Sequence, residues 1–453
     1  MLGIPHEYLT PDLPGVGGVI KKYHEDFRVE EVPLYSPVGS GEHSYVEIEK
    51  TDLVTRDAID RLARALNVDT GRFGYAGLKD RRGITRQVLS IALVPPERIR
   101  ELKISGLRIL NVALHRNKLR IGHLRGNRFK IRVRGVRDDA AERVPPILDF
   151  IQKHGMPNYY GHQRFGTRAD AHFTGRAILN TDYKAAVHRF LGCPSSVEGN
   201  PQVVAARRAF MAGDWEAAHA RFPTQYREEL RALKFLRDRG EDYAGAIRHL
   251  RAGTRKLFMT SFQSYLFNLC LTERIRQCGQ ELERLEAGDL AYLHRNGAVF
   301  RVDDVAETQP RSDSFELSPT GPLFGTKMPA PQGRQLEIEA AVAAREGLTV
   351  DQVRTLFPTK ILEGGRRPLR VQVQDLKWRL EEGDLILEFF LQKGAYATTF
   401  IRELTKHETF SSEFYGDGEA EKHQLWRAPE STAERVADSE TPGSTGSIVS
   451  RSP

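Results

Sequence analysis

The sequence predicts an α/β protein of the α+β kind, in which strand-rich segments at both ends of the chain enclose a helical middle. Three observations indicate this class. Apolar and polar residues alternate along much of 18–134 and again along 369–391, as they do in half-buried strands. From residue 168 to about 277, apolar residues recur instead at helical spacing. The length of 453 residues allows two or three domains and at least one substantial core.

The first part of the chain is predicted to be built from short strands around one amphipathic helix. Its elements, in order, are a strand, a turn and a second strand within 18–31, a strand over 43–50, a helix over 56–67 and a strand over 87–93. Thr55 is the predicted N-cap of the helix, because a threonine hydroxyl accepts hydrogen bonds from the open N–H groups of a first turn. The loop between this helix and the last strand is therefore held at both ends, as catalytic loops often are.

That loop places a single carboxylate, Asp80, among several cations, and glycines at 74, 77 and 83 favour a tight turn. The cations are Lys79, Arg81, Arg82 and Arg86. Neighbouring cations keep a carboxylate ionised well below neutral pH, which suits a nucleophile or proton acceptor that acts on nucleic acid. The alternative is that Asp80 caps a turn or pairs with a surface arginine, as loop aspartates usually do. The residues alone leave both interpretations open.

A basic stretch follows, and its distribution of charge indicates a nucleic-acid partner. No Asp or Glu occurs from Leu102 to Arg137, and the whole chain has a formal net charge of +7. Basic and apolar residues alternate within 118–121 and 129–134, which predicts two strands with one face in the core and one basic face outside. A solvated strand face is the alternative, but such a face usually mixes both signs, whereas contact with an RNA backbone requires one. The predicted RNA-binding residues are Arg116, Lys118, Arg120, Arg125, Arg128, Lys130, Arg132 and Arg134.

A second candidate loop, residues 157–168, combines aromatic, amide and arginine side chains. Aromatic rings offer stacking surfaces for bases and arginines offer donors to phosphate. Arg164 is therefore a further predicted RNA-binding residue. The alternative is a domain junction packed by its aromatic residues, and both interpretations can hold.

The middle of the chain is predicted to be an inserted domain, roughly 157–335. It contains a long apolar helix over 256–277 and a hairpin around Asn296-Gly297, a dipeptide typical of tight turns between strands. Strands return after it, and if they complete the first sheet, the first domain is discontinuous, 1–156 plus 336–410. Ser, Thr, Pro, Gly and Glu dominate the end of the chain, which predicts a disordered tail over 428–453.

Other features narrow the class of protein. The sequence has no run of about eighteen apolar residues, so no membrane span is expected, and its start lacks the pattern of a secretory signal. Cys193, Cys270 and Cys278 show no metal-ligand spacing, so we expect reduced thiols in a cytoplasmic protein that binds no metal. The sequence leaves the oligomeric state open, with a monomer as one option.

Several of these stretches, taken together and in order, resemble the TruD family of tRNA pseudouridine synthases. Dispersed motifs in one order are more specific than any single motif, and these extend from residue 21 to about 404. The residues that carry the resemblance are Lys21 with Glu25-Asp26-Phe27, Ala76-Gly77-Leu78-Lys79-Asp80 with Thr85 and Gln87, Gly126-Asn127-Arg128-Phe129, Asn158 to Gly166, and Lys393 to Thr398 with Arg402-Glu403-Leu404. Two positions depart from the family pattern: Gly83 stands where a small aliphatic residue is expected, and Tyr396 where phenylalanine is also usual.

The resemblance implies a pseudouridine-synthase catalytic domain with a mixed, largely antiparallel sheet, interrupted by an inserted TRUD domain. It implies that the protein isomerises a uridine of tRNA, typically at position 13, to pseudouridine without a cofactor or a metal. By the same resemblance, Asp80 is the nucleophile and Lys21 is its ion-pair partner. The implied uridine pocket consists of Phe129, stacked on the target base, with Phe27, Asn127 and Tyr396.

Other classes of function make different demands on the sequence. A non-catalytic tRNA-binding protein or RNA-folding chaperone would not need Asp80 and Lys21 together, so their presence argues against it. A nuclease of this size usually has clustered carboxylates for metal ions, and the Asp80 loop has one. A methyltransferase would need a glycine-rich loop between a strand and a helix with an acid downstream, which we do not find.

Overall fold

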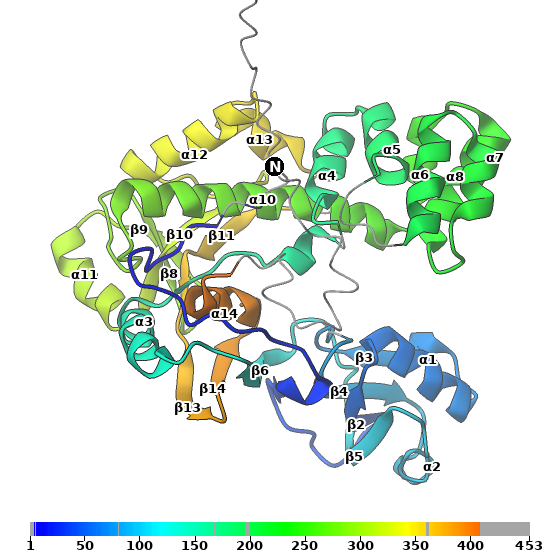
Figure 1. Ribbon diagram of the computed structural model, residues 1–453, viewed down its shortest axis with the longest axis horizontal. Coiled ribbons are helices and arrows are strands. Elements are labelled where there is room, and N and C mark those ends of the chain that lie inside the picture. Colours follow the sequence, from blue (N-terminus) through cyan, green and yellow to red (C-terminus); the bar gives the residue numbers. More distant parts are fainter. Residues whose placement is uncertain are drawn as a thin grey trace, which may run out of the picture.

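A computed structural model describes residues 4, 6–79, 81–166, 168–194, 200–358 and 362–407. Its centre is an eight-stranded sheet in the order β13-β14-β6-β1-β4-β2-β5, with β3 paired to β4 (Figure 1). Among the described strand pairs of this sheet only β1–β4 is parallel, so the sheet is mixed and largely antiparallel, which confirms the predicted fold class. The strands are β1 (Phe27–Pro33), β2 (His43–Thr51), β3 (Phe73–Tyr75), β4 (Ile84–Ala92), β5 (Leu107–His115), β6 (Leu124–Val133), β13 (Gln374–Glu381) and β14 (Asp384–Gln392).

The elements predicted for the first part are largely present. The strand expected over 43–50 is β2, the one over 87–93 overlaps β4, and the helix over 56–67 is α1 (Thr55–Leu66). Within 18–31 the second strand is β1, whereas the first is reduced to a single bridge between Val19 and Arg134.

Two local predictions are wrong. Thr55 is not the N-cap of α1, because Val54 occupies that position and the Thr55 hydroxyl instead donates to Gln87 Oε1. Residues 118–121 form no strand. They belong to the connection between β5 and β6, where the Leu119 N–H group donates to Ser90 Oγ. A four-residue alternation is too short to decide between a strand and a connection tied down by such side-chain bonds.

The helices of this part pack on one face of the large sheet. Val29 of β1 and Leu387 of β14 stand on the face where α3 (Ala140–His154) and α14 (Ala397–Thr405) pack. Leu89 of β4 stands on the same face beneath α1. The opposite face carries charged side chains around a hollow of about 590 Å³, lined among others by Arg28, Glu30, Glu49, Arg86 and Lys130.

The middle of the chain is mostly helical and is organised along α10 (Ala252–Cys278), which matches the helix predicted over 256–277 (Figure 1). Helices α4 to α9 gather around one end of α10, and a four-stranded sheet, β11-β10-β8-β9, lies near the other. Strands β8 and β9 pair antiparallel on either side of Asn296-Gly297, as the hairpin prediction requires. The elements are η3 (His162–Phe165), α4 (Ala171–Leu179), α5 (Tyr183–Leu191), α6 (Pro201–Met211), α7 (Trp215–Arg221), α8 (Arg227–Arg239), α9 (Tyr243–His249), β8 (Leu290–Leu293), β9 (Val299–Arg301), α11 (Val305–Asp313), β10 (Leu317–Leu323), α12 (Gly333–Arg345), α13 (Val350–Leu356) and β11 (Gly365–Pro368).

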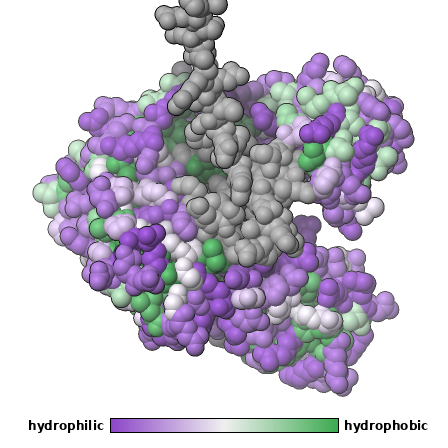
Figure 2. Space-filling model, in the orientation of Figure 1, coloured by the Kyte–Doolittle hydropathy of each residue, from purple (hydrophilic) through white to green (hydrophobic). Residues whose placement is uncertain are grey.

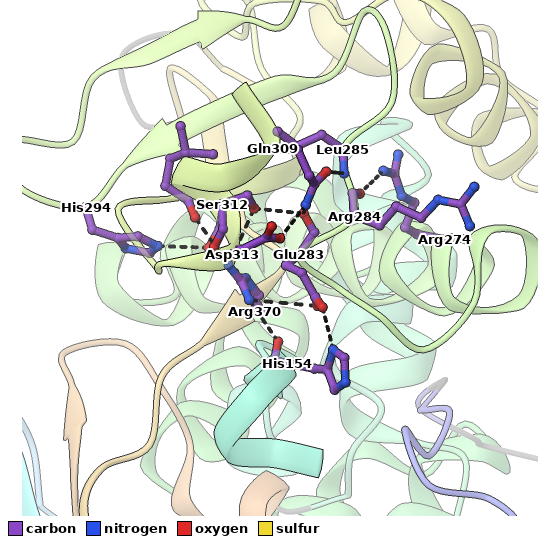
Figure 3. A network of polar contacts seen from close by, with 12 residues as sticks. His154, Arg274, Glu283, Arg284, Leu285, His294, Gln309, Ser312, Asp313 and Arg370 are labelled. Atoms are coloured by element: carbon purple, nitrogen blue, oxygen red, sulfur yellow. Dashed lines mark hydrogen bonds and ion pairs between the residues drawn. The ribbon is translucent and has the colours of Figure 1, made fainter. Parts of the chain in front are cut away.

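The helical part and the large sheet are joined where β7 (Met156–Pro157) pairs with β12 (Arg370–Val371). Arg370 is fully buried there and donates to the backbone carbonyl groups of His154 and Ser312 (Figure 3). Glu283 lies 3.9 Å from the Arg370 guanidinium and 2.5 Å from His154 Nδ1. One buried polar network therefore connects the end of α3, β12 and α11.

Helices α12 and α13 and strand β11 pack with the helical part. Val342 of α12 and Val353 of α13 share a core cluster with Phe262 of α10, and β11 pairs with β10. The chain therefore rejoins the large sheet only at β13. Residues from 408 onward, including the tail predicted to be disordered over 428–453, lie outside the described residues.

Figure 2 shows that the coloured surface on this side of the molecule is largely hydrophilic, with small and scattered hydrophobic areas. The large apolar side chains instead form clusters inside the fold, one of them between the large sheet and helices α3 and α14. No helix among the described residues is both long and apolar enough to cross a membrane.

Candidate active site

A cleft of about 530 Å³ lies where the helix-covered face of the large sheet meets the helical part. Its walls come from β1, β6, the loop after β3, the η3 turn, α10 and the start of α14. Folding thus brings together side chains from distant motifs of the sequence. The predicted site residues that line this cleft are Phe27, Asn127, Phe129, Arg164 and Tyr396.

Aromatic rings of the sheet form one wall of the cleft. Phe129 of β6 stands next to Val29 across the β1–β6 ladder, and its ring stacks on Phe389 of β14 at a centroid distance of 5.3 Å. The ring of Phe27 meets it edge-on at 6.2 Å. Lys21 is buried beside this wall, with its Nζ atom 4.4 Å from the centroid of the Phe27 ring. Phe129 is therefore held rigidly and still lines the cleft, as a platform for a flat ring must be.

Asp80, the predicted nucleophile, lies outside the described residues. Three of the four cations near it in the sequence are paired with acids from other elements, and the expectation that they keep Asp80 ionised stays a prediction. Lys79 pairs with Glu31, Arg81 pairs with Asp52, and Arg86 pairs with Glu49. These acids come from β1, β2 and the turn after β2. The three cations are close to Asp80 in the sequence, but their partners belong to other parts of the fold.

A buried polar triad, missed by sequence reasoning, lies in the wall of the cleft. Glu31 and Asn127 face one another across the β1–β6 ladder, and the Lys79 ammonium reaches between them. Lys79 Nζ is 2.9 Å from Glu31 Oε2 and donates to Asn127 Oδ1 at 2.7 Å. Glu31 could have been noticed, because it continues the inward-facing series of Phe27 and Val29, where an acid is unusual.

The opposite wall joins two motifs that are far apart in the sequence. Tyr396, at the start of α14, meets Tyr160 edge-on at 6.1 Å. Arg164 donates from Nε to Ser264 Oγ of α10 and lies over the Tyr160 ring at 5.6 Å. The Arg367 guanidinium donates to the backbone carbonyl groups of Asn158 and Gly394, and so ties the two motifs together.

Three large apolar side chains are exposed on the rim of the cleft. Leu78, Ile121 and Leu257 are 65%, 77% and 38% exposed, and all three line the cleft. They come from the loop after β3, the connection before β6, and α10. Exposed apolar side chains gathered around a hollow indicate a ligand with apolar faces of its own.

The predicted basic face of β6 is compensated by acids, which corrects the expectation of a single sign of charge. Each cation from Arg128 to Arg134 pairs with an acid contributed by η1 (His24–Asp26), β13 or β14: Arg128 with Asp375, Lys130 with Glu388, Arg132 with Glu381 and Asp384, and Arg134 with Asp26. The acid-free stretch of sequence therefore does not produce an acid-free surface, because β14 lies beside β6 in the sheet.

The segment 116–125, which leads from β5 into the start of β6, is different. Arg116, Arg120 and Arg125 are exposed, and within the described part of the chain they have no acidic partner. Lys118 donates to the backbone carbonyl of Gly71. Ile121, on the rim of the cleft, lies in the same segment, so uncompensated positive charge lies close to the mouth of the site.

The described residues contain neither a metal-binding cluster nor a disulfide. No group of three or more His, Cys, Asp or Glu side chains there is placed to hold a metal ion. The cysteines are free thiols, and burial raises the pKa of the Cys270 thiol well above its usual value. That thiol is therefore protonated and structural at neutral pH.

Comparison with known proteins gives a consistent result. The model of the family "tRNA pseudouridine synthase D (TruD)" matches residues 3–404. The chain is 44% identical over 400 residues to the tRNA pseudouridine synthase D of Geobacter metallireducens, covering 88% of this chain and 97% of that one. Identity to the Thermus thermophilus protein of the same name is 35% over 406 residues, covering 89% and 93%.

Among solved structures, the chain is similar to a Methanosarcina mazei protein described as a candidate tRNA pseudouridine synthase D. The TM-score is 0.73 at 28% sequence identity, and the match covers 89% of this chain and 97% of that one. The family match spans the cleft, both of its walls and the whole of α10. The chain therefore belongs to the TruD family of tRNA pseudouridine synthases.

Proposed function

We propose that this protein isomerises a uridine of tRNA to pseudouridine, with position 13 as the target. The observation that carries the proposal is the cleft itself, which gathers Phe27, Asn127, Phe129 and Tyr396 at the end of the loop that leads to Asp80. The names of the relatives in the family support the same reaction and the same class of substrate.

The roles proposed for the side chains follow from the chemistry. The reaction breaks the N1–C1′ bond of uridine and forms a C5–C1′ bond, so the base must leave the helical stack and turn within the site. Stacking on Phe129 contributes about 1–3 kcal/mol, which offsets part of the cost of unstacking the base. The carboxylate of Asp80 can attack C1′, attack the base or assist loss of the 2′ proton. Lys21 is proposed to stabilise that carboxylate as an anion.

We propose that the tRNA backbone meets the cations near the rim first. Arg116, Arg120, Arg125 and Arg164 are not held in ion pairs with described acids, so they can bind phosphate without breaking one. Arg128, Lys130, Arg132 and Arg134 must exchange an existing partner, and Lys118 a backbone carbonyl. Their contribution to RNA binding is expected to be smaller, because the acid that each leaves behind opposes the phosphate.

The packing also supports a proposed division of the chain into a discontinuous catalytic domain and an inserted domain that begins near residue 157. For the second crossing, which the sequence predicts near residue 335, we propose a position near residue 372, because α12, α13 and β11 pack with the helical part. We further propose that the protein is located in the cytoplasm, together with its tRNA substrate.

Mapping of pseudouridine on unmodified tRNA transcripts tests the proposal. Wild-type protein is expected to produce one new pseudouridine at position 13, and Asp80→Asn is expected to produce none while retaining tRNA affinity within about tenfold. Pseudouridine formed by Asp80→Asn would refute the nucleophile assignment. Tight binding with no pseudouridine on any transcript would instead favour a tRNA-binding or RNA-folding chaperone role.

A further inference from the structure

The Glu31–Lys79–Asn127 triad differs from a surface ion pair in its burial and in how firmly it is held. The side chains of Lys79 and Glu31 are 6% and 1% exposed, although both are charged groups that proteins rarely bury. Glu31 is also anchored on its other oxygen, because Oε1 accepts from the Val88 N–H group at 3.3 Å. The ammonium therefore has a defined position, set by a carboxylate that is itself fixed to β4.

This ammonium decides which way the Asn127 amide points. A lysine ammonium offers three donors and no acceptor, so the amide must turn its oxygen toward Lys79. The observed contact is the one expected, with Asn127 Oδ1 2.7 Å from Lys79 Nζ. The reversed amide would place its NH₂ group against the ammonium and lose the bond. Lys79 therefore locks an orientation that an isolated asparagine would leave free.

The locked amide presents a donor to the cleft. Asn127 is half-buried and lines the cleft, and within the described part of the chain its Nδ2 group donates to no protein atom. The open group next to the Phe129 platform is thus an N–H donor. Asn127 and Phe129 lie on the same face of β6, so a base stacked on Phe129 would have its edge near this donor.

We propose that Lys79 is a positioning residue for base selection: by holding Asn127 with Nδ2 toward the cleft, it makes the site read the 4-carbonyl oxygen of uracil and reject cytosine. Uracil carries an acceptor at that position, and cytosine carries an amino donor. A donor facing another donor leaves both unpaired in a desolvated site, which is how such sites reject a close analogue. This inference rests on the proposed function, because it assigns the base that the same cleft takes.

The backbone and the side chain of Lys79 make two separate sets of bonds. The backbone N–H group donates to Thr55 Oγ1 at 2.9 Å, and Thr55 in turn donates to Gln87. The backbone before Asp80 is therefore held by one set of bonds and the amide of Asn127 by another. Substitution of the Lys79 side chain removes the second set and leaves the first in place.

Binding of matched RNAs tests the inference. The RNAs are two tRNA transcripts that differ only in U or C at the target, which is bulged in both so that neither base is paired before binding. The full-length protein carrying Asp80→Asn prevents turnover. It is expected to bind the U transcript about tenfold more tightly than the C transcript, the ratio that one well-placed base contact gives. Adding Lys79→Met is expected to bring the ratio close to one, with affinity for the C transcript changed by less than about twofold.

Glu31→Gln separates base selection from stability. The glutamine side chain keeps an oxygen for Lys79, so the U/C ratio is expected to persist even though the melting temperature falls. A role in stability alone would move the melting temperature and leave the ratio unchanged in both variants. If Lys79→Met alone does not fold, the double variant Lys79→Met/Glu31→Gln removes both charges and is expected to lose the ratio. Lys327→Met, which breaks an exposed pair with Glu363, is the matched control and is expected to keep the ratio.

The failure of this inference differs from the failure of the proposed function. A U/C ratio that survives folded Lys79→Met overturns the inference. A ratio of one for the protein with Lys79 intact, while wild-type protein forms pseudouridine, also overturns it and leaves the proposed function standing. Absence of pseudouridine with wild-type protein on the U transcript refutes the proposed function, whatever the binding ratio.

Discussion

At the scale of single residues, the site depends on side chains that serve the core and the cleft together. Phe129 is 9% exposed and packs against Phe389 within the main core, yet it lines the cleft. A residue of this kind cannot be truncated without affecting both stability and binding. A control variant must therefore separate the loss of stability from the loss of RNA binding.

Phe129→Leu is expected to lower kcat/KM by about tenfold or more, because an aliphatic side chain cannot replace base stacking worth about 1–3 kcal/mol. The measurement is steady-state kinetics on a tRNA transcript. Phe389→Leu is the control, since Phe389 stacks on Phe129 and is not among the residues that line the cleft. It is expected to lower the melting temperature by a similar amount with a smaller loss of kcat/KM. Equal kinetic losses in the two variants would remove Phe129 from contact with the base.

Protonation of a buried histidine makes stability depend on pH. Burial lowers the pKa of His172 from 6.5 to about 3 in the folded protein, with its ring stacked on Tyr265. Below pH 6.5 the unfolded chain binds a proton that the folded protein does not, so stability falls as the pH falls from 6.5 toward 3. At pH 5 the loss from this group is about 2 kcal/mol. His172→Phe is expected to lose less stability than wild-type protein between pH 7 and pH 5 in urea unfolding, and equal losses would contradict this.

At the scale of elements, β6 and the segment 116–125 differ in how far neighbouring strands compensate their positive charge. The cations of β6 from Arg128 onward meet acids of η1, β13 and β14, whereas the arginines of 116–125 lie outside the part of β6 that pairs with β14. A run of basic residues in the sequence therefore predicts a nucleic-acid partner only where the fold leaves that positive charge uncompensated.

Arg120→Ala/Arg125→Ala is expected to weaken tRNA binding and to reduce the slope of log affinity against log salt by about 1.4–1.8, as two lost phosphate contacts require. Arg132→Ala/Arg134→Ala removes the same charge from ion pairs. It is expected to reduce the slope by less and to lower the melting temperature more, because it leaves Asp26 and Asp384 without their partners. The measurement is filter binding over a salt series, and equal slopes for the two double variants would show that β6 meets the RNA as closely as the segment before it does.

At the scale of the whole molecule, the large sheet and the helical part are coupled through buried polar contacts as well as through apolar packing. Burial lowers the pKa of Arg370 to about 10, so its guanidinium remains charged at neutral pH within the junction. It joins β12, α3 and α11, and a lysine could not make the same set of bonds from a single ammonium.

Arg370→Met is expected to destabilise the protein by about 3–5 kcal/mol, because it removes the buried positive charge next to Glu283 and the donor to the backbone carbonyl groups of His154 and Ser312. Arg370→Lys is expected to restore less than half of that loss. Urea unfolding of the full-length protein measures both, with the exposed Arg295→Met as control. A loss below about 1 kcal/mol would show that the junction is held by its apolar contacts alone.

Deletion of residues 428–453 is expected to leave pseudouridine formation unchanged. The family match ends at residue 404, and every wall of the cleft comes from residues before that point. The measurement compares initial rates of the truncated and full-length proteins on the same transcript. A rate reduced by about tenfold or more would show that the tail takes part in binding or catalysis.

Many of the individual elements, and the motifs, could be predicted without coordinates, although the strand predicted over 118–121 is absent. Local periodicity predicted β2, β4, α1 and α10, because alternation and helical spacing are properties of neighbouring residues. The order of motifs identified residues that folding brings into the cleft, including Phe27, Phe129 and Tyr396. These predictions needed no knowledge of which segments would meet.

The pairing of charges and the point where the chain returns to the large sheet depend instead on tertiary contacts. The partner of Arg128 lies 247 residues away, on a strand that neighbours β6 only through β14. The partner of Lys79 is an acid on β1, 48 residues earlier, and its contact with Asn127 spans another 48. Periodicity carries no information about such pairs, because an ion pair depends on distance in space and on burial. For the same reason, the role proposed for Lys79 follows from the fold and not from its place beside Asp80.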